Sequence, residues 1–377
     1  MNRRQWLRAM PGAFVGAGAI VGASDAPGAR DEPDVRDARA SRSGIVQYPA
    51  LGPGRPLVFP RDFGAHPEVR TEWWYLTGWL DDGREAFGVQ VTFFRTRTAH
   101  DERDPSRFAP KQLLFAHAAL ALPGERRLRH DQRAARAGFA NARFDERDTD
   151  VRVLEWRLAR GPDDRYRAEI VARDFRLALA FTPPGPPVPQ GDGGYSRKGP
   201  RPEQASEYYS RPQLRVSGTV ARSRDAAQAR PVTGLAWLDH EWSSEILDAD
   251  AVGWDWTGLN FDDGSALMAF RIRGRDGGTV WSHARWAGDP TRDAPPRFEA
   301  LREWRSPRTG ARYPCAMRLS VGKRTFELAP LFDDQELDAR ASTGTVYWEG
   351  AVRVLEGGRP VGRGYLELTG YAGAVRL

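Results

Sequence analysis

Hydrophobic and polar residues alternate with a period of two along much of the chain. The clearest run is 86–93, where phenylalanine and valine alternate with alanine, glycine, glutamine and threonine. Because successive side chains of a strand point to opposite faces, this pattern predicts a strand with one buried face. No segment shows a helical period of comparable clarity. Similar runs predict strands at 111–121, 151–158, 166–181, 214–221, 232–242, 252–261, 265–273, 279–286, 312–320, 345–355 and 361–371.

Turn signals separate these runs. The 39 glycines and 28 prolines favour many short strands joined by turns over a helical bundle. Segment 182–213 is too rich in proline for a strand or helix, and we expect a long functional or linking loop there. The dipeptides that signal turns include Asp82-Gly83, Asp263-Gly264 and Gly357-Gly358.

An internal echo predicts two related domains. The sequence 74–83 recurs loosely at 254–264 with one residue inserted, and each copy precedes an alternating strand. The length of 377 residues gives room for two domains. Closure removes exposed sheet edges, so we expect an all-β chain of two tandem antiparallel β-barrels. The expected boundaries are 57–244 and 245–377.

The N-terminus has the pattern of an export signal. Arg3 and Arg4 precede a weakly apolar stretch that ends in small residues and is too short to span a membrane. Residues 1–23 therefore predict a twin-arginine signal and a periplasmic or secreted protein. We expect residues 24–56 to form a flexible leader. The single cysteine, Cys315, excludes an internal disulfide, and we expect it to be buried and not catalytic.

The charge balance gives no sign of a nucleic-acid partner. Removing Arg3, Arg4 and Arg8 with the signal leaves 53 of the 56 basic residues against 50 acidic ones. The arginines are interspersed with acids and form no long basic run.

Several catalytic patterns are absent from the sequence. There is no Gly-x-Ser-x-Gly elbow, phosphate loop, dinucleotide motif or His-Glu-x-x-His pair. The six histidines show no metal-ligand spacing, so we predict no metal site.

Three clusters, at 72–75, 238–242 and 253–256, each place a carboxylate among large aromatic residues. In a strand, His240 shares the face of leucine and tryptophan, whereas Asp239 lies on the other face with a glutamate. We therefore expect His240 to face an apolar interior. The structural interpretation is that the tryptophans fill the core and the acids cap turns or pair with arginines. The functional interpretation is a site, because buried carboxylates are costly without a role.

Such a carboxyl has a specific chemistry. Burial among aromatic rings raises its pKa, so it can stay protonated near neutral pH and donate a proton. Aromatic faces can stabilise the cation that then develops. Together these groups suit protonation of an alkene, followed by capture by water or by an internal nucleophile. The same cavity would also hold an apolar ligand without any reaction.

Several runs, in order, resemble one known family. They resemble the AttH-like predicted secreted hydrolases, which belong with the carotenoid 1,2-hydratase (hydroxyneurosporene synthase) superfamily. The resemblance spans residues 57–377 and implies two lipocalin-like (calycin-type) barrels and no organic cofactor. It also implies acid-driven addition of water across a terminal isoprenoid double bond, with hydrolysis of an apolar, isoprenoid- or lipid-like substrate as the alternative reaction. The runs that carry it are 59–67, 71–75, 196–200, 208–210, 238–244, 347–350 and 365–371.

The resemblance also implies roles for single residues. His240 and Trp242 match a His-x-Trp pair of the carotenoid enzymes, and Asp255 matches their acid. We therefore expect Asp255 to be the general acid, with His240 and Asp239 orienting water or tuning that acid. Glu72 is a further candidate catalytic residue. The residues expected to bind substrate are Trp74, Tyr75, His117, Trp242, Trp254 and Trp256.

Two other functions fit the same residues. A periplasmic lipid or isoprenoid carrier would use the same pocket without turnover. A carbohydrate-active β-protein would need exposed tryptophans in a polar cleft, which the alternating apolar strands disfavour. The expected partner is a hydrophobic small molecule, and association with a membrane surface or an envelope transporter is left open.

Overall fold

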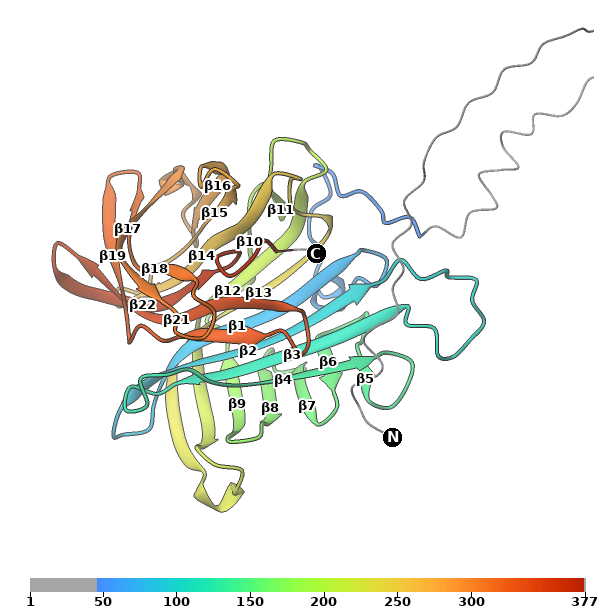
Figure 1. Ribbon diagram of the computed structural model, residues 1–377, viewed down its shortest axis with the longest axis horizontal. Coiled ribbons are helices and arrows are strands. Elements are labelled where there is room, and N and C mark those ends of the chain that lie inside the picture. Colours follow the sequence, from blue (N-terminus) through green and yellow to red (C-terminus); the bar gives the residue numbers. More distant parts are fainter. Residues whose placement is uncertain (1–45, 376–377) are drawn as a thin grey trace, which may run out of the picture. The chain divides into compact units, whose positions relative to one another are not determined.

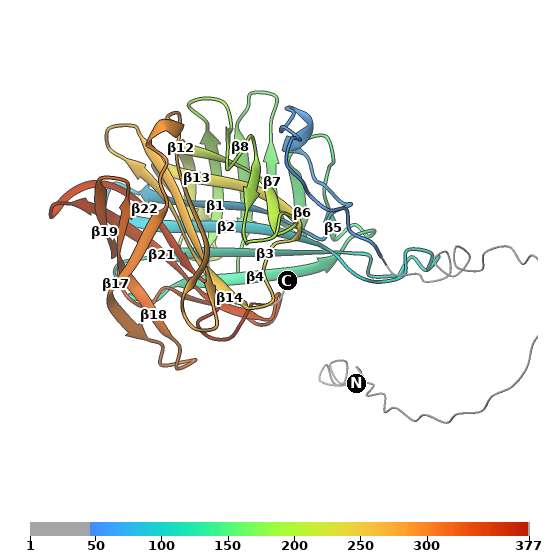
Figure 2. The same cartoon turned by 90° about the horizontal axis from the view of Figure 1, so that it is seen from above.

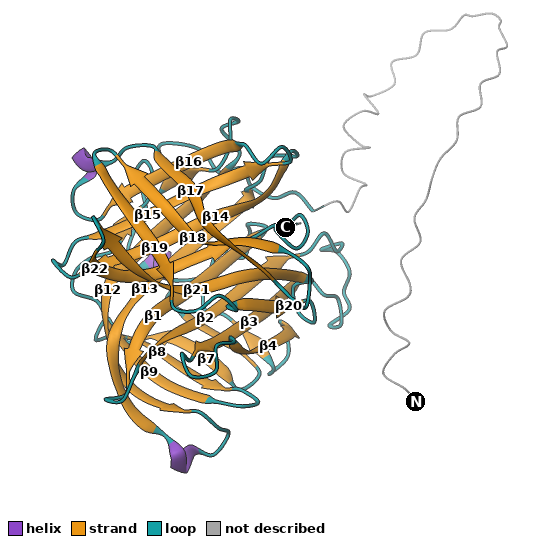
Figure 3. Ribbon diagram, turned by 60° about the vertical axis from the view of Figure 1, so that its left-hand side comes forward, coloured by secondary structure: helices purple, strands orange, loops and turns teal. Residues whose placement is uncertain are grey.

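The computed structural model describes residues 46–375, which form two antiparallel β-sheets. Figure 3 shows how completely strands dominate this part of the chain. Its helices are single 3-10 turns, and none is long and apolar enough to cross a bilayer. They are η1 (Arg61–Phe63), η2 (Ala226–Gln228) and η3 (Pro290–Arg292). The predicted all-β class is confirmed.

The first sheet curls into a nearly closed barrel of eleven strands, and two short strands pair with one of them (Figure 1). Along the barrel the order is β4-β3-β2-β1-β13-β12-β9-β8-β7-β6-β5, and β10 and β11 pair with β12. The strands are β1 (Thr71–Asp81), β2 (Ala86–Arg97), β3 (Gln112–Ala121), β4 (Arg129–Arg136), β5 (Ala142–Arg143), β6 (Asp150–Val153), β7 (Trp156–Arg160), β8 (Tyr166–Val171), β9 (Arg176–Thr182), β10 (Val188–Pro189), β11 (Tyr195–Arg197), β12 (Ala205–Ala221) and β13 (Arg230–Glu245).

The second sheet is a curled half-barrel of eight strands, with one short strand added. The order is β16-β15-β14-β22-β21-β19-β18-β17, and β20 pairs with β21. The strands are β14 (Ala251–Phe261), β15 (Ala266–Gly274), β16 (Thr279–Trp286), β17 (Pro296–Arg305), β18 (Arg312–Val321), β19 (Arg324–Pro330), β20 (Glu336–Ala339), β21 (Thr345–Glu356) and β22 (Arg359–Leu368).

The two sheets pack against each other through the outer face of the barrel (Figure 2). Strands β1, β2 and β13 carry this face, because alternate residues point inward to the barrel core and outward to the second sheet. The indole of Trp79 donates to the carbonyl of Gly364 across the junction, at 3.1 Å. A Cβ at Gly88 would lie 2.4 Å from the Tyr365 hydroxyl, so glycine permits this close approach.

The structure changes some of the expected elements. The runs 151–158 and 166–181 are each two strands, β6 with β7 and β8 with β9. The expectation of no strand in 182–213 is wrong, because β12 begins at Ala205. The two copies of the echo fall on β1 and β14, the first long strands of the two sheets.

The terminal predictions fall mostly beyond the described residues. The expected signal at 1–23 and residues 24–45 of the expected leader lie outside the described part of the chain. In the remainder of the leader, Leu51 is buried in the core of the first barrel.

Candidate functional site

A cavity of about 310 Å³ lies between the two sheets. Strands of the barrel form one wall, and β14, β15, β21 and β22 of the half-barrel form the other. The wall is largely aromatic, and four carboxyl groups interrupt it. The aromatic and imidazole side chains are Trp73, Tyr75, Phe94, Phe115, His117, Trp254, Trp256, Phe270 and Tyr347.

Asp239 on β13 is the first of these carboxyl groups. Its Oδ1 accepts from the Ser210 hydroxyl at 2.5 Å and from the Trp237 indole at 2.7 Å. Its Oδ2 accepts from the Tyr208 hydroxyl at 2.7 Å. Burial raises the pKa of Asp239 to about 7, although these three hydrogen bonds oppose the rise. Asp239 is therefore poised to exchange a proton near neutral pH.

Glu349 and Glu367 form a carboxyl pair, because they lie directly opposite each other on β21 and β22. The Tyr75 hydroxyl donates to Glu349 Oε2 at 2.8 Å, and the Trp254 indole donates to Glu367 Oε1 at 2.7 Å. Burial and the negative charge of Glu367 hold the pKa of Glu349 well above its usual range. Burial raises the pKa of Glu367 to about 8. The pair therefore keeps at least one proton at neutral pH.

One oxygen of this pair is available to donate a proton to a bound molecule. Glu349 Oε1 is buried and has no hydrogen-bond partner within residues 46–375. A protonated carboxyl would direct its O–H from this oxygen to a bound molecule. Sequence reasoning missed both glutamates. The criterion that selected the three clusters, a carboxylate beside aromatic residues, also fits Glu349, which follows Tyr347 and Trp348.

Glu241 is the fourth carboxyl, and it differs because it has a cation. Lys198 Nζ lies 2.9 Å from Glu241 Oε1 and donates to the Ser196 hydroxyl at 3.0 Å. The ammonium also lies 4.2 Å from the centre of the Phe270 ring. Lys198 belongs to the proline-rich segment 182–213 and to the run 196–200 that carries the family resemblance, but the sequence analysis gave it no role in the site.

His117 lies on the wall of the cavity between two hydroxyl groups. Its Nδ1 is 2.7 Å from the Tyr347 hydroxyl, and its Nε2 is 2.9 Å from the Ser342 hydroxyl. Burial lowers the pKa of His117 to about 3, so the imidazole is neutral and a weak base.

The structure divides the predicted site residues among three places. Five of them line the intersheet cavity: Asp239, Tyr75, His117, Trp254 and Trp256. Four face the inside of the first barrel: Glu72, His240, Trp74 and Trp242. The predicted alternation along β13 is confirmed, because His240 lies inside with Trp242 while Asp239 lines the cavity.

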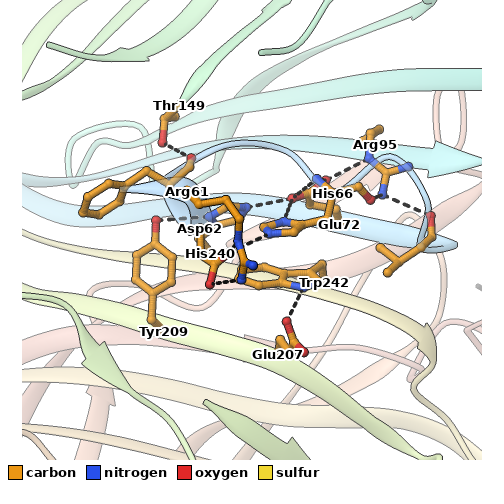
Figure 4. A network of polar contacts seen from close by, with 12 residues as sticks. Arg61, Asp62, His66, Glu72, Arg95, Thr149, Glu207, Tyr209, His240 and Trp242 are labelled. Carbon is orange, nitrogen blue, oxygen red and sulfur yellow. Dashed lines mark hydrogen bonds and ion pairs between the residues drawn. The ribbon is translucent and has the colours of Figure 1, made fainter. Parts of the chain in front are cut away.

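The residues inside the barrel form an ionic cluster (Figure 4). Glu72 Oε1 lies 2.9 Å from His240 Nε2 and 3.0 Å from His66 Nδ1, and Arg95 Nε donates to Glu72 Oε2 at 2.8 Å. Burial alone would raise the pKa of Glu72, but Arg95 and the two imidazoles hold it well below its usual range. Burial would likewise lower the pKa of His66, but Asp62 and Glu72 raise it to about 9. Glu72 is therefore a carboxylate and not a proton donor.

Asp255 lies in a third place, on the inner face of the half-barrel strand β14. It accepts from Arg271 Nε at 2.6 Å, from Arg273 Nε at 2.9 Å and from the Tyr371 hydroxyl at 2.9 Å. The tryptophans on either side line the cavity, so strand alternation turns Asp255 away from it. Asp255 faces away from the cavity and two guanidinium groups donate to it, so its position does not suit the expected role of general acid there.

The comparisons with known proteins agree with this architecture. The AttH-like family matches residues 50–371, and the chain belongs to this family. A solved structure of a candidate AttH protein from Nitrosomonas europaea is 50% identical, with a TM-score of 0.79. The match covers 86% of this chain and 100% of that one. No curated protein matches the chain significantly.

Two more distant structures share the fold. Kievitone hydratase from Nectria haematococca has a TM-score of 0.64 at 14% identity, over 87% of this chain and 98% of its own. CghA, solved with Sch210972, has a TM-score of 0.51 at 12% identity, over 88% and 96%. The AttH-like chain therefore has the fold of enzymes that include a hydratase.

Proposed function

We propose that this protein is a cofactor-independent hydratase that adds water to a double bond of an apolar, isoprenoid- or lipid-like molecule. The observation that carries the proposal is the set of protonatable carboxyls in the aromatic intersheet cavity. Asp239 and Glu349 are buried there and Glu367 is partly buried, and the hydrogen bonds they accept come from neutral donors. A protonated acid beside aromatic faces is what protonation of an alkene requires.

Glu349 is the proposed proton donor. Its O–H bond breaks, and the π electrons of the alkene form a C–H bond, which leaves a carbocation and the Glu349 carboxylate. The faces of Trp254 and Trp256 stabilise the cation. A water oxygen then forms the C–O bond, and the resulting oxonium loses a proton to ionised Asp239. Exchange with solvent water returns both carboxyls to their first state.

Hydrolysis is the second candidate, because Ser342 and His117 lie within hydrogen-bond distance in the same cavity, at 2.9 Å. In a nucleophilic mechanism His117 would remove the proton of the Ser342 hydroxyl. The pKa of His117 is about 3, and its other nitrogen faces a tyrosine hydroxyl, so it is a weak base for this step. We therefore place hydration first.

Native mass spectrometry with a cell-envelope lipid extract tests the proposal. We expect the wild-type chain to hold a ligand whose mass increases by one water, with an isotope label when the water is labelled. Glu349→Gln should hold the same ligand unchanged, whereas the exposed control Glu299→Gln should convert it like the wild type. Conversion of the ligand by Glu349→Gln would show that Glu349 is not the proton donor. Loss of conversion in Ser342→Ala alone would favour hydrolysis. A ligand that the wild type never alters would instead indicate a carrier.

Export is a separate part of the proposal, and it rests on the N-terminal sequence alone. A twin-arginine route would place the enzyme in the periplasm or outside the cell. Replacing Arg3 and Arg4 with lysine should keep the protein in the cytoplasmic fraction. Unchanged fractionation would reject this route.

A further inference from the structure

We propose that the interior of the first barrel holds a divalent transition-metal site, best suited to Zn²⁺, formed by His66, Glu72 and His240. Their ligand atoms all lie within 4.8 Å of one another, and all three residues are buried. Figure 4 shows the two imidazoles directed at the same carboxylate. This site lies on the opposite face of β1 and β13 from the intersheet cavity, so it is independent of the proposed hydratase.

Two of the three distances between the ligand atoms are close to those of a tetrahedral metal site, and the third is within 4.8 Å. His240 Nε2 and His66 Nδ1 lie 2.9 Å and 3.0 Å from Glu72 Oε1. Ligands bound to Zn²⁺ at about 2.0–2.1 Å in tetrahedral geometry are separated by about 3.3 Å. These two pairs therefore need to open by only a few tenths of an ångström. The metal ion would take the place of the hydrogens between the imidazoles and the carboxylate.

Each of the three ligands also has a partner that orients it. His66 Nε2 lies 3.3 Å from Asp62 Oδ1, and His240 Nδ1 lies 3.1 Å from the Tyr209 hydroxyl. The second oxygen of Glu72 accepts from Arg95 Nε at 2.8 Å. Partners of this kind fix the tautomer and the direction of metal-binding imidazoles, because the far nitrogen then carries the hydrogen. The near nitrogen of each imidazole then faces the metal, and Glu72 Oε1 faces it while also accepting from the His66 main-chain N–H at 3.1 Å.

The position of the ligands indicates what the metal would do. Glu72 and His240 lie on the paired strands β1 and β13, whereas His66 lies on the segment that follows η1. A metal ion would fasten this segment to the barrel wall. Two nitrogens and one oxygen also form the donor set that zinc accepts, and three protein ligands leave one position open.

Two tryptophans give this site an optical signal. The Trp242 ring stacks on His66 with 3.7 Å between ring centres, and the Trp74 ring stacks on His240 at 4.8 Å. A bound Cu²⁺ ion quenches tryptophan fluorescence at this range, whereas Zn²⁺ does not. Cu²⁺ should therefore report occupancy, and Zn²⁺ should compete with it.

The test uses the full chain, treated with a chelator, dialysed against Zn²⁺ and analysed for metal content. We expect one Zn²⁺ per wild-type chain and a melting temperature that rises with Zn²⁺ concentration. His240→Gln and Glu72→Gln should lose the bound metal. The matched control His100→Gln removes a part-exposed imidazole that pairs with Asp104, and it should still bind one Zn²⁺.

Two further variants keep the test decisive if the ligand variants do not fold. Trp242→Phe keeps all three ligands, so it should bind one Zn²⁺ but lose part of the quenching by Cu²⁺. Glu349→Gln should bind Zn²⁺ like the wild type, so failure of the hydratase proposal does not affect this one. The metal proposal is overturned if the wild-type chain retains no Zn²⁺. It is also overturned if His100→Gln lowers binding as much as His240→Gln, or if Trp242→Phe leaves the quenching unchanged.

Discussion

The cluster inside the barrel and the cavity between the sheets both bury carboxyl groups among tryptophans, but they hold them in opposite protonation states. Glu72 contacts Arg95 and two imidazoles, and its pKa lies well below the usual range. Glu349 contacts a tyrosine hydroxyl and faces Glu367, and its pKa lies well above it. Aromatic surroundings alone therefore do not decide the charge of a buried carboxyl. The neighbouring cations decide it.

The same strands carry both environments. On β1, Glu72 points into the barrel and Tyr75 points into the cavity, and on β13 His240 and Asp239 divide in the same way. A barrel wall one strand thick thus separates a carboxylate with a lowered pKa from three carboxyls, Asp239, Glu349 and Glu367, whose pKa values are raised. The two sets of side chains stay on opposite sides of the wall, because successive residues of a strand point to opposite faces.

Glu72→Ala should give the largest effect on stability. The change leaves Arg95 buried without its carboxylate partner, and breaking a buried ion pair in this way costs about 3–5 kcal/mol. Urea denaturation at neutral pH measures the loss. Glu349→Ala removes no partner of a cation and should cost clearly less. Equal losses in the two variants would contradict the contrast between the regions.

The pH dependence of stability should separate the two regions next. Asp239 and Glu367 bind protons more tightly in the folded chain than in the unfolded chain. Their contribution is therefore complete below their ordinary pKa values of 3.8 and 4.5, and it is lost as the pH rises through about 7 and about 8. We expect each of the two groups to contribute a loss of about 2–4 kcal/mol between pH 5 and pH 8.

Glu367→Gln should remove the part of this loss that comes from Glu367, because the amide does not ionise. Within the barrel cluster Glu72 has the opposite sign, since its pKa is lowered and its contribution is lost as the pH falls below 4.5. His66 has the same sign as the cavity acids, because its pKa is raised to about 9 and its contribution is lost as the pH rises from 6.5 through about 9. Denaturation curves at several pH values measure both the loss of stability at high pH and the loss at low pH. A loss of equal size between pH 5 and pH 8 in wild type and Glu367→Gln would show that the pKa of Glu367 is not raised in the folded chain.

Gly88→Ala tests the packing that forms the cavity. The added methyl group would lie 2.4 Å from the Tyr365 hydroxyl and 2.7 Å from the Ala351 methyl group. Overpacking of this kind costs about 1–3 kcal/mol, and it should also weaken ligand binding by moving the sheets apart. Gly52→Ala is the matched control, because an added Cβ there meets no atom within 4 Å. Gly83→Ala would not serve, because Gly83 has a φ of 78°, which strains any residue other than glycine.

Trp254→Phe should give the smallest effect. It removes the indole N–H that donates to Glu367, a loss of about 1 kcal/mol for one hydrogen bond. Without this donor the pKa of Glu367 should rise further, because the hydrogen bond favours the carboxylate. The alkaline midpoint of the stability curve measures that shift. A midpoint that moves to lower pH would contradict the hydrogen bond from Trp254 to Glu367.

Much of the fold followed from the sequence because the period of two is a local signal. It gave most strands and placed His240 and Asp239 on opposite faces. It did not show which face of each strand borders the cavity, so the resemblance led to Asp255 although alternation turns that residue inward. His240 and Glu72 are 168 residues apart, and only the pairing of β1 with β13 brings them together. The glutamate pair depends in the same way on the register of β21 and β22.

The chain passes from the first sheet to the second through residues 246–250 alone, yet both sheets supply the cavity wall. A molecule that fills the cavity would contact both sheets at once and so help to hold them together. A substitution in the cavity wall that favours a new ligand would then also change how the two sheets pack. A substitution there that tightens the packing of the sheets would change which ligand binds. Side chains that line the cavity, such as Tyr75 and Trp256, therefore also hold the two sheets together.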